Sequence, residues 1–317
     1  MKILRFLNIS VVVILMVLSS PARAEEYAVL LKGMDNPYWK AMEEGFRDTG
    51  KSLGISIYLQ GAQSDSAAEE QLNICETMIL RKPQALIVGA VNAYNLLPCL
   101  KKAQSQNIPV INIDSSLDKK VSQEAGVDIP FSIGSDNYAI GRMAAEYLKG
   151  KTGKVLVIEG LPGSLGSEGR TKGFKDNIKN MQIAASVAGD WDRLKAANIA
   201  RDVLTAHPDL TTIYAANDTM ALGAVETLRS LGRNDIVVVG TDGTTDAVKA
   251  IKEGRLTASI AQLPYLMAKV ALEKTRDYLA RGSRPAGDWS YNQYVDTVIF
   301  DRAALEKPSN PLMKYVR

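Results

Sequence analysis

Hydrogen-bonding side chains stand where several apolar segments of this chain end. Each segment has the length of a strand, and a polar residue closes or follows it: Lys32, Asp114, Asn217, Asp242 and Gln262. Aspartate accepts hydrogen bonds, lysine donates them, and asparagine and glutamine do both. Such a mixed set suits a ligand with several hydroxyl groups. The alternative is that individual members only cap the helices that follow, as Asp and Asn often do.

Aromatic side chains accompany this polar set. Tyr38 and Trp39 follow Asn36 and a proline at the predicted start of a helix, and Trp191 stands in the segment GDWDR. Aromatic faces cover the apolar C–H faces of a sugar ring, so the combination predicts a neutral sugar or polyol. Two alternatives stay open: the first two aromatics could fill a core, and the ligand could be an amino acid.

The inventory of residues argues against catalysis. A single histidine, His207, leaves little scope for a Ser-His-Asp or Cys-His arrangement, and no His/Cys cluster has the spacing of a zinc site. The triplet GKT at 150–152 resembles the end of a P-loop, but Ala145 stands where that motif needs glycine. We therefore expect no enzyme, no metal and no cofactor.

The elements that must position these residues alternate along the chain, as in an α/β protein. Continuous apolar runs such as YAVLLK, ALIVGA and KVLVIEG predict parallel strands buried on both faces. They are too numerous for one ordinary sheet, and they form two similar halves. We predict two doubly wound Rossmann-like lobes joined by a multi-strand hinge. Ligands bind beyond the carboxyl ends of such strands, so both lobes should contribute to one polar site.

The predicted boundaries follow the two halves. The N-terminal lobe is expected to comprise residues 25–130 and about 264–288. The C-terminal lobe is expected to comprise residues 131–263 and about 289–317, with Trp289 packing near a hinge crossing. The glycine-rich segment GLPGSLGSEGR should be a flexible loop that delivers Arg170 at the start of the next helix.

Residues 1–24 predict a secretory signal peptide. Lys2 and Arg5 precede the apolar run VVVILMVL, and SSPARA ends in an A-x-A cleavage pattern. We place the cut after Ala24, which predicts a periplasmic protein. The net charge of the chain is +3, and removal of Lys2, Arg5 and Arg23 leaves about zero. A near-neutral surface argues against nucleic acid or an anionic membrane as partner.

The chain has two cysteines, Cys75 and Cys99. An even number in an exported protein favours a disulfide. Each cysteine lies in a predicted helix, and the two helices flank one strand, so they could pack side by side on one face of a sheet. Two buried free thiols are the alternative.

A set of motifs gives the chain a family resemblance. In order they are NPYW, VINID, IGSDN, EGRTKGF, GDWDR, AANDTMALGA, VVVGTDGT and IAQLP. With them the chain resembles the periplasmic sugar-binding proteins of bacterial ABC importers, in the ribose/allose-binding group. The resemblance covers nearly the whole mature chain. It implies the type I periplasmic binding protein fold, in which two lobes close over one sugar.

The resemblance also implies a ligand-binding set. Carried over position by position, its members are Lys32, Asn36, Tyr38, Trp39, Asp114, Arg170, Trp191, Asn217, Asp242 and Gln262. Two departures concern the sugar. Ribose binders carry Asp-Arg where this chain reads Asp114-Ser115, and they carry Ser at the position of Lys32, where allose binders have Lys. Both place the chain nearer the allose type.

The implied function is capture of a monosaccharide or related polyol and its delivery to ABC permease subunits, which would dock on both lobes. A periplasmic sensor subunit that presents its ligand to a chemoreceptor or histidine kinase is the alternative. A repressor with the same lobes is disfavoured, because the N-terminus predicts a signal peptide rather than a helix-turn-helix. A monomer is expected by default.

Overall fold

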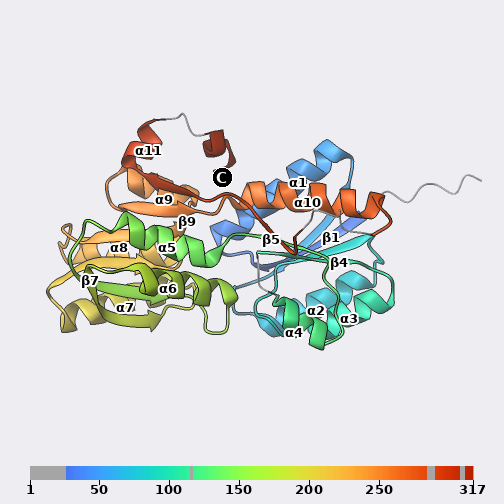
Figure 1. Ribbon diagram of the computed structural model, residues 1–317, viewed down its shortest axis with the longest axis horizontal. Helices are drawn as coiled ribbons and strands as arrows, with labels where there is room; N and C mark the ends of the chain where they lie inside the picture. The colour runs from blue at the N-terminus through green and yellow to red at the C-terminus, as the bar shows by residue number, and fades with distance from the viewer. Residues whose placement is uncertain (1–25, 115–116, 284–289, 308–310, 317) are drawn as a thin grey trace, which may run out of the picture.

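The computed structural model describes residues 26–114, 117–283, 290–307 and 311–316, and Figure 1 shows two lobes side by side. The expected signal peptide, its cleavage after Ala24, and Ser115 and Trp289 lie outside the described residues. Within these ranges no helix is long and apolar enough to cross a membrane.

The first lobe is built on a six-stranded parallel sheet in the order β11-β5-β4-β3-β1-β2. Its strands are β1 (Glu26–Gly33), β2 (Ser56–Ala62), β3 (Ala85–Val88), β4 (Val110–Ile113), β5 (Ser132–Gly134) and β11 (Asn292–Tyr294). One face of the sheet packs on α1 (Pro37–Leu53) and α10 (Pro264–Ala280), and the other packs on α2 (Ala68–Ile79) and α3 (Leu97–Ser105). The short helix α4 (Lys119–Glu124) follows β4.

The second lobe repeats this plan with the order β12-β10-β9-β8-β6-β7. Its strands are β6 (Gly153–Glu159), β7 (Met181–Ala188), β8 (Leu210–Ala215), β9 (Val237–Asp242), β10 (Ala258–Ala261) and β12 (Val298–Asp301), the last antiparallel to β10. Helices α5 (Asn137–Tyr147) and α6 (Leu165–Asn177) cover one face. Helices α7 (Arg193–Ala206), α8 (Asp218–Ser230) and α9 (Thr245–Lys252) cover the other. Helix α11 (Arg302–Glu306) and a 3-10 turn (Pro311–Tyr315) end the described chain.

Both faces of the central strands are buried, which explains their continuous apolar sequence. In β1 the side chains of Val29 and Leu31 pack toward α1 and α10, whereas Ala28 and Leu30 pack toward α2 and α3. The prediction of an α/β protein with two doubly wound lobes is confirmed.

Within the described residues the chain passes between the two sheets three times, from β5 to α5, from β10 to α10 and from β11 to β12. Strand β5 pairs with β4, and β11 pairs with β5, so both belong to the first sheet. The predicted boundaries had placed these two strands in the C-terminal lobe. We propose that the lobes instead divide at about residues 135, 262 and 296, because the sheet that holds a strand also fixes its motion.

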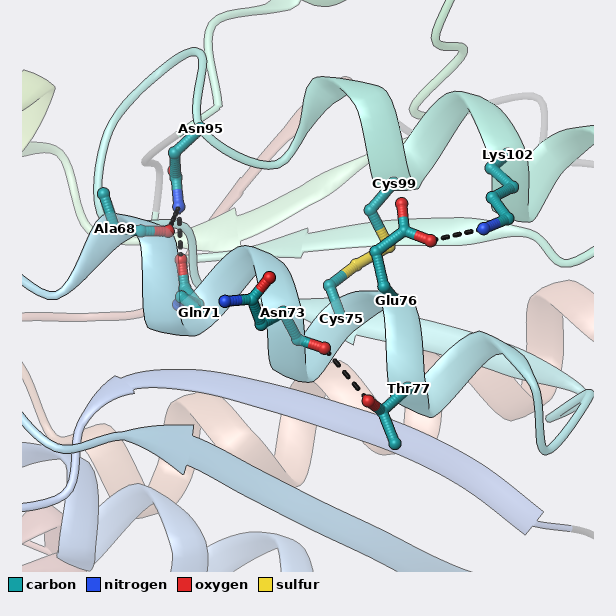
Figure 2. The surroundings of a disulfide bond; sticks show 9 residues. All are labelled: Ala68, Gln71, Asn73, Cys75, Glu76, Thr77, Asn95, Cys99 and Lys102. Carbon is teal, nitrogen blue, oxygen red and sulfur yellow. Dashed lines mark hydrogen bonds and ion pairs between the residues drawn. A yellow bond between two sulfur atoms is a disulfide. The ribbon is translucent and has the colours of Figure 1, made fainter.

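A disulfide joins Cys75 in α2 to Cys99 in α3, so the prediction of a bond is confirmed and the alternative of two free thiols is not. Figure 2 shows the two helices side by side with the bond between them, and an ion pair between Glu76 and Lys102 lies nearby. Both sulfurs are fully buried. The bond therefore clamps the helical layer on one face of the first sheet.

Candidate functional site

All ten residues of the predicted ligand-binding set line one cavity between the lobes. The first lobe contributes Lys32, Asn36, Tyr38, Trp39 and Asp114, and the second contributes Arg170, Trp191, Asn217, Asp242 and Gln262. Asp65, Ser164 and Gly166 complete the lining. The cavity lies at the carboxyl ends of both parallel sheets, where the fold places ligand sites. The structure thus brings the whole set together, and its role in binding remains a proposal.

Asp114 organises the half of the cavity formed by the first lobe. Its carboxylate accepts a hydrogen bond of 2.8 Å from the hydroxyl of Tyr38 and lies 3.4 Å from the ammonium of Lys32. The same ammonium lies 5.3 Å from the ring centre of Trp39, within the range of a cation–π contact. Burial raises the pKa of Tyr38 well above its usual value, and the charge of Asp114 adds to this, so the phenol stays a hydroxyl donor.

Arg170 organises the half formed by the second lobe. One terminal nitrogen of its guanidinium donates to the carbonyl of Ala216 at 2.7 Å and lies 3.4 Å from Asp242. The ring centre of Trp191 is 5.6 Å from the guanidinium carbon. The side-chain nitrogen of Gln262 donates to the carboxylate of Asp242 at 2.7 Å. Burial raises the pKa of Asp242, and Arg170 opposes this rise by favouring the charged carboxylate.

Arg170 lies in the second turn of α6 rather than at its start. The helix begins at Leu165, so the glycine-rich segment that was expected to be a loop is helical over its second half. A side chain at Gly141 would meet the carbonyl of Arg170 at 2.0 Å, and therefore glycine there lets α5 and α6 pack closely. This packing puts Arg170 Nε 2.9 Å from Asn137, at the crossing between the lobes.

Three cavity residues have a left-handed backbone that non-glycine residues rarely adopt. The φ angles are 67° at Asp114, 66° at Trp191 and 122° at Asp242. Each such conformation costs about 1–3 kcal/mol and clusters at functional sites. The chain thus accepts strain to aim two carboxylates and one indole into the same cavity.

Capping and lining the cavity turn out to be compatible roles. Asn36 caps α1 by accepting from the amide of Tyr38 at 3.0 Å, and Asn217 caps α8 by accepting from that of Met220 at 2.9 Å. In each case the side-chain oxygen caps the helix, which leaves the amide nitrogen as a donor for another partner; that of Asn36 donates to Asp65. Asp218 does not line the cavity: its buried carboxylate accepts from the amides of Gly243 and Thr244 and fixes the loop after β9.

Asp65 and Ser164 line the cavity but were not predicted from the sequence. Asp65 lies in the turn between β2 and α2, where both of its oxygens accept hydrogen bonds. Its position after a predicted strand was the available signal, but Gln63 and Ser64 separate Asp65 from the end of β2. Ser164 directly precedes α6 in the glycine-rich segment. In that segment the sequence pointed only to Arg170 as a binding residue.

Both cations of the cavity already pair with carboxylates, which favours a neutral ligand over an anion. Two cations, Lys32 and Arg170, face three carboxylates, Asp65, Asp114 and Asp242. The side-chain oxygen of Gln262 is buried without a protein partner and can accept from a ligand hydroxyl. Among the described residues no group of three or more His, Cys, Asp or Glu side chains could hold a metal ion. The arrangement can hydrogen-bond a polyhydroxyl ring and cover its faces with aromatic groups.

Two α/β lobes around a polar cavity are typical of a solute-binding protein, and comparisons with known proteins assign the chain to this class. The family model of the periplasmic binding protein domain matches residues 27–283. The chain is 33% identical over 258 residues to the D-allose-binding periplasmic protein of Escherichia coli K12, covering 79% of this chain and 83% of the relative. It is 31% identical over 282 residues to the ribose import binding protein RbsB of the same organism, covering 87% and 92%.

Solved structures extend the likeness to three dimensions. A periplasmic solute binding protein from Actinobacillus succinogenes 130z with bound D-allose superposes with a TM-score of 0.83 at 30% identity, covering 89% of this chain and 99% of that one. The chain belongs to the periplasmic binding protein domain family, as an ABC transporter monosaccharide-binding protein. Proteins of this family bind solutes and are not enzymes.

Proposed function

We propose that this protein captures a neutral monosaccharide of the allose or ribose type, or a related polyol, in the periplasm and presents it to the permease of its ABC importer. The observation that carries the proposal is the convergence of donors, acceptors and three aromatic side chains from both lobes on one cavity. Buried polar groups left unpaired cost about 1–3 kcal/mol each. A site of this kind therefore selects a ligand whose hydroxyls match all of them.

An allose-type ligand is favoured over ribose itself by the surroundings of Lys32. Its side chain is only 7% exposed and pairs with Asp114 instead of pointing into water. The ammonium thus offers donors where the ribose-type proteins would offer a short serine hydroxyl. A hexose has one more hydroxyl-bearing carbon than a pentose and can use such an extra donor. Ser115, the second departure, lies outside the described residues.

Capture by closure follows from how the site is divided. Asp114 and Tyr38 belong to the first lobe, whereas Arg170 and Asp242 belong to the second. A sugar contacts both pairs only when the lobes close, so the ligand stabilises the closed arrangement through its differential affinity. Three chain crossings between the lobes provide the hinge for this motion. The closed form would then dock on the permease through both lobes, and a monomer is sufficient for that.

The test is a binding screen of the mature protein by thermal shift, followed by calorimetry on the hits. The panel contains D-allose, D-psicose, D-ribose, other pentoses and hexoses, ribitol and xylitol, with amino acids as negative controls. A ligand that binds only the folded chain raises its melting temperature. One tight binder among the sugars or polyols is expected, and the absence of any would overturn the proposal, as would a tight amino acid ligand.

Variants distinguish this site from adventitious binding. Asp114→Asn removes the ion pair with Lys32 but keeps an acceptor for Tyr38, so the lobe should fold while the affinity falls by about 100-fold or more. Asp35→Asn is the matched control because Asp35 is exposed and does not line the cavity. In the source bacterium, deletion of the gene should abolish uptake of the labelled ligand, and only the wild type and the control variant should restore it.

A further inference from the structure

Asp65 is the one carboxylate of the cavity that pairs with neutral donors only. Its Oδ1 accepts from the indole nitrogen of Trp39 at 2.5 Å, and its Oδ2 accepts from the amide nitrogen of Asn36 at 2.7 Å. Burial raises the pKa of Asp65, although both donors and nearby Lys32 favour the carboxylate. Two N–H groups that point at two separate oxygens need a carboxylate, because an asparagine or glutamine has only one acceptor oxygen.

These two bonds fix the orientation of both partners. An indole has a single donor, so the bond at Nε1 sets the direction of the Trp39 N–H. Edge-on packing against Tyr38, with ring centres 4.9 Å apart, restrains the plane of the ring. The Asn36 amide is held at both ends, by Asp65 at its nitrogen and by the amide of Tyr38 at its oxygen. One N–H of Asn36 then remains, and its direction is set.

The backbone is arranged to bring Asp65 to this point. A side chain at Gly33 would lie 2.4 Å from the amide nitrogen of Asp65, so the turn after β2 reaches the end of β1 only because residue 33 is glycine. Trp39 and Asn36 are 3% and 8% exposed, and they line the cavity together with Asp65. Asn36 and Asp65 also line a neighbouring surface groove.

We propose that Asp65 is a positioning residue of the sugar site, which holds the Trp39 indole and the Asn36 amide in the orientations that the ligand meets. This inference rests on the proposed sugar-binding role of the cavity. Asp65 acts through these two residues, since each of its oxygens is already directed at one of them. Loss of the carboxylate should therefore cost affinity by releasing the two groups rather than by removing a contact with the sugar.

The test combines the indole N–H signals in proton–nitrogen NMR spectra with calorimetry. The Trp39 signal is assigned by its loss in Trp39→Phe. In unliganded Asp65→Ala this signal should shift upfield and exchange with solvent about ten-fold faster or more, while that of Trp191 is unchanged. The affinity for the tightest sugar should fall about ten-fold, as for one lost hydrogen bond to a charged group. Glu44→Ala, which removes the same charge from an exposed position on α1, should change neither quantity.

A double variant separates orientation from mere loss of structure. Asn36→Asp combined with Asp65→Asn exchanges the amide and the carboxylate, so one N–H···O bond between the two positions is retained and aspartate still caps α1. In the double variant the chemical shift of the Trp39 indole should lie closer to the wild-type value than it does in Asp65→Asn alone. A signal that stays at the position seen in Asp65→Asn would overturn the proposal.

The remaining outcomes are distinct. If affinity falls in Asp65→Ala while the Trp39 signal stays unchanged, Asp65 touches the sugar directly and does not position Trp39. If the signal changes while affinity stays unchanged, the orientation is irrelevant to binding, and the proposal fails although the sugar site stands. If the wild type binds no sugar or polyol at all, the proposed function is wrong, and this inference, which rests on it, is wrong as well.

Discussion

Gly160, directly after β6, offers a way to move one aromatic side chain of the cavity without touching it. A side chain at this position would lie 2.1 Å from the nearest carbon of the Trp191 ring, and two more ring atoms lie within 2.4 Å. Ordinary contact begins at 3.4 Å, so in Gly160→Ala the indole must shift by about 1.3 Å or more. The backbone at Gly160 does not have a positive φ, and alanine fits it without strain there.

The expected result is a loss of affinity with a native fold. Displacement of Trp191 from a ligand face and from its place beside Arg170 should cost about 1–2 kcal/mol of binding free energy, or about 5- to 30-fold in Kd. Calorimetry with the tightest sugar measures this loss, and circular dichroism checks the fold. The unfolding temperature should fall only modestly, because Trp191 is partly exposed, and overpacking that such a ring can relieve costs less than in a closed core.

A double-variant cycle decides whether the effect passes through Trp191. Trp191→Ala removes the ring that Gly160→Ala would push, so the double variant should bind about as tightly as Trp191→Ala alone. Additive losses would refute the reasoning, because they would mean that Gly160 acts on the site by another route. Unchanged affinity in both single variants would remove Trp191 from the ligand-binding set.

Three further predictions concern stability and ligand charge. Replacement of Cys75 and Cys99 by serine removes a disulfide between residues 24 positions apart in the sequence. This should lower the free energy of unfolding, measured in urea, by about 3 kcal/mol; an unchanged midpoint of the urea transition would contradict this. Burial raises the pKa of Asp218 to about 7, so the folded chain binds this proton more tightly than the unfolded chain, and the contribution to stability declines as pH rises from about 4 to about 7. The stability of the wild type relative to Asp218→Asn should therefore decrease by about 3 kcal/mol between about pH 5 and about pH 8, and a difference that stays constant or grows would contradict the burial argument. A uronic acid should bind about ten-fold or more weakly than its neutral parent sugar, because the cavity carries more carboxylates than cations; equal affinities in calorimetry would disprove this.

The sequence was sufficient for the fold and for most of the cavity lining because both depend on periodic features. Continuous apolar runs such as that of β1 identify parallel strands, and the residue that ends such a run must lie at the edge of the sheet where ligands bind. Lys32, Asp114 and Gln262 could be predicted in this way. The motif resemblance supplied residues such as Arg170, which no strand end indicates.

Features that depend on pairing between distant segments were less accessible. No periodicity indicates that β5 and β11 join the first sheet, since that depends on which edge strand each one meets. Asp65 is separated from its strand by polar residues, and its importance arises from two donors on another element. The start of α6 at Leu165 was missed because its first turn is rich in glycine and serine, which local propensity assigns to a loop.

The central claim is that one sugar is held between the lobes by side chains of both. A crystal structure of the mature protein grown with its tightest-binding sugar tests this most directly. We expect one sugar ring per chain in the cavity, hydrogen-bonded to Asp114 of the first lobe and to Arg170 of the second, with its faces against the aromatic side chains. A sugar bound elsewhere, or held by one lobe alone, would contradict the account.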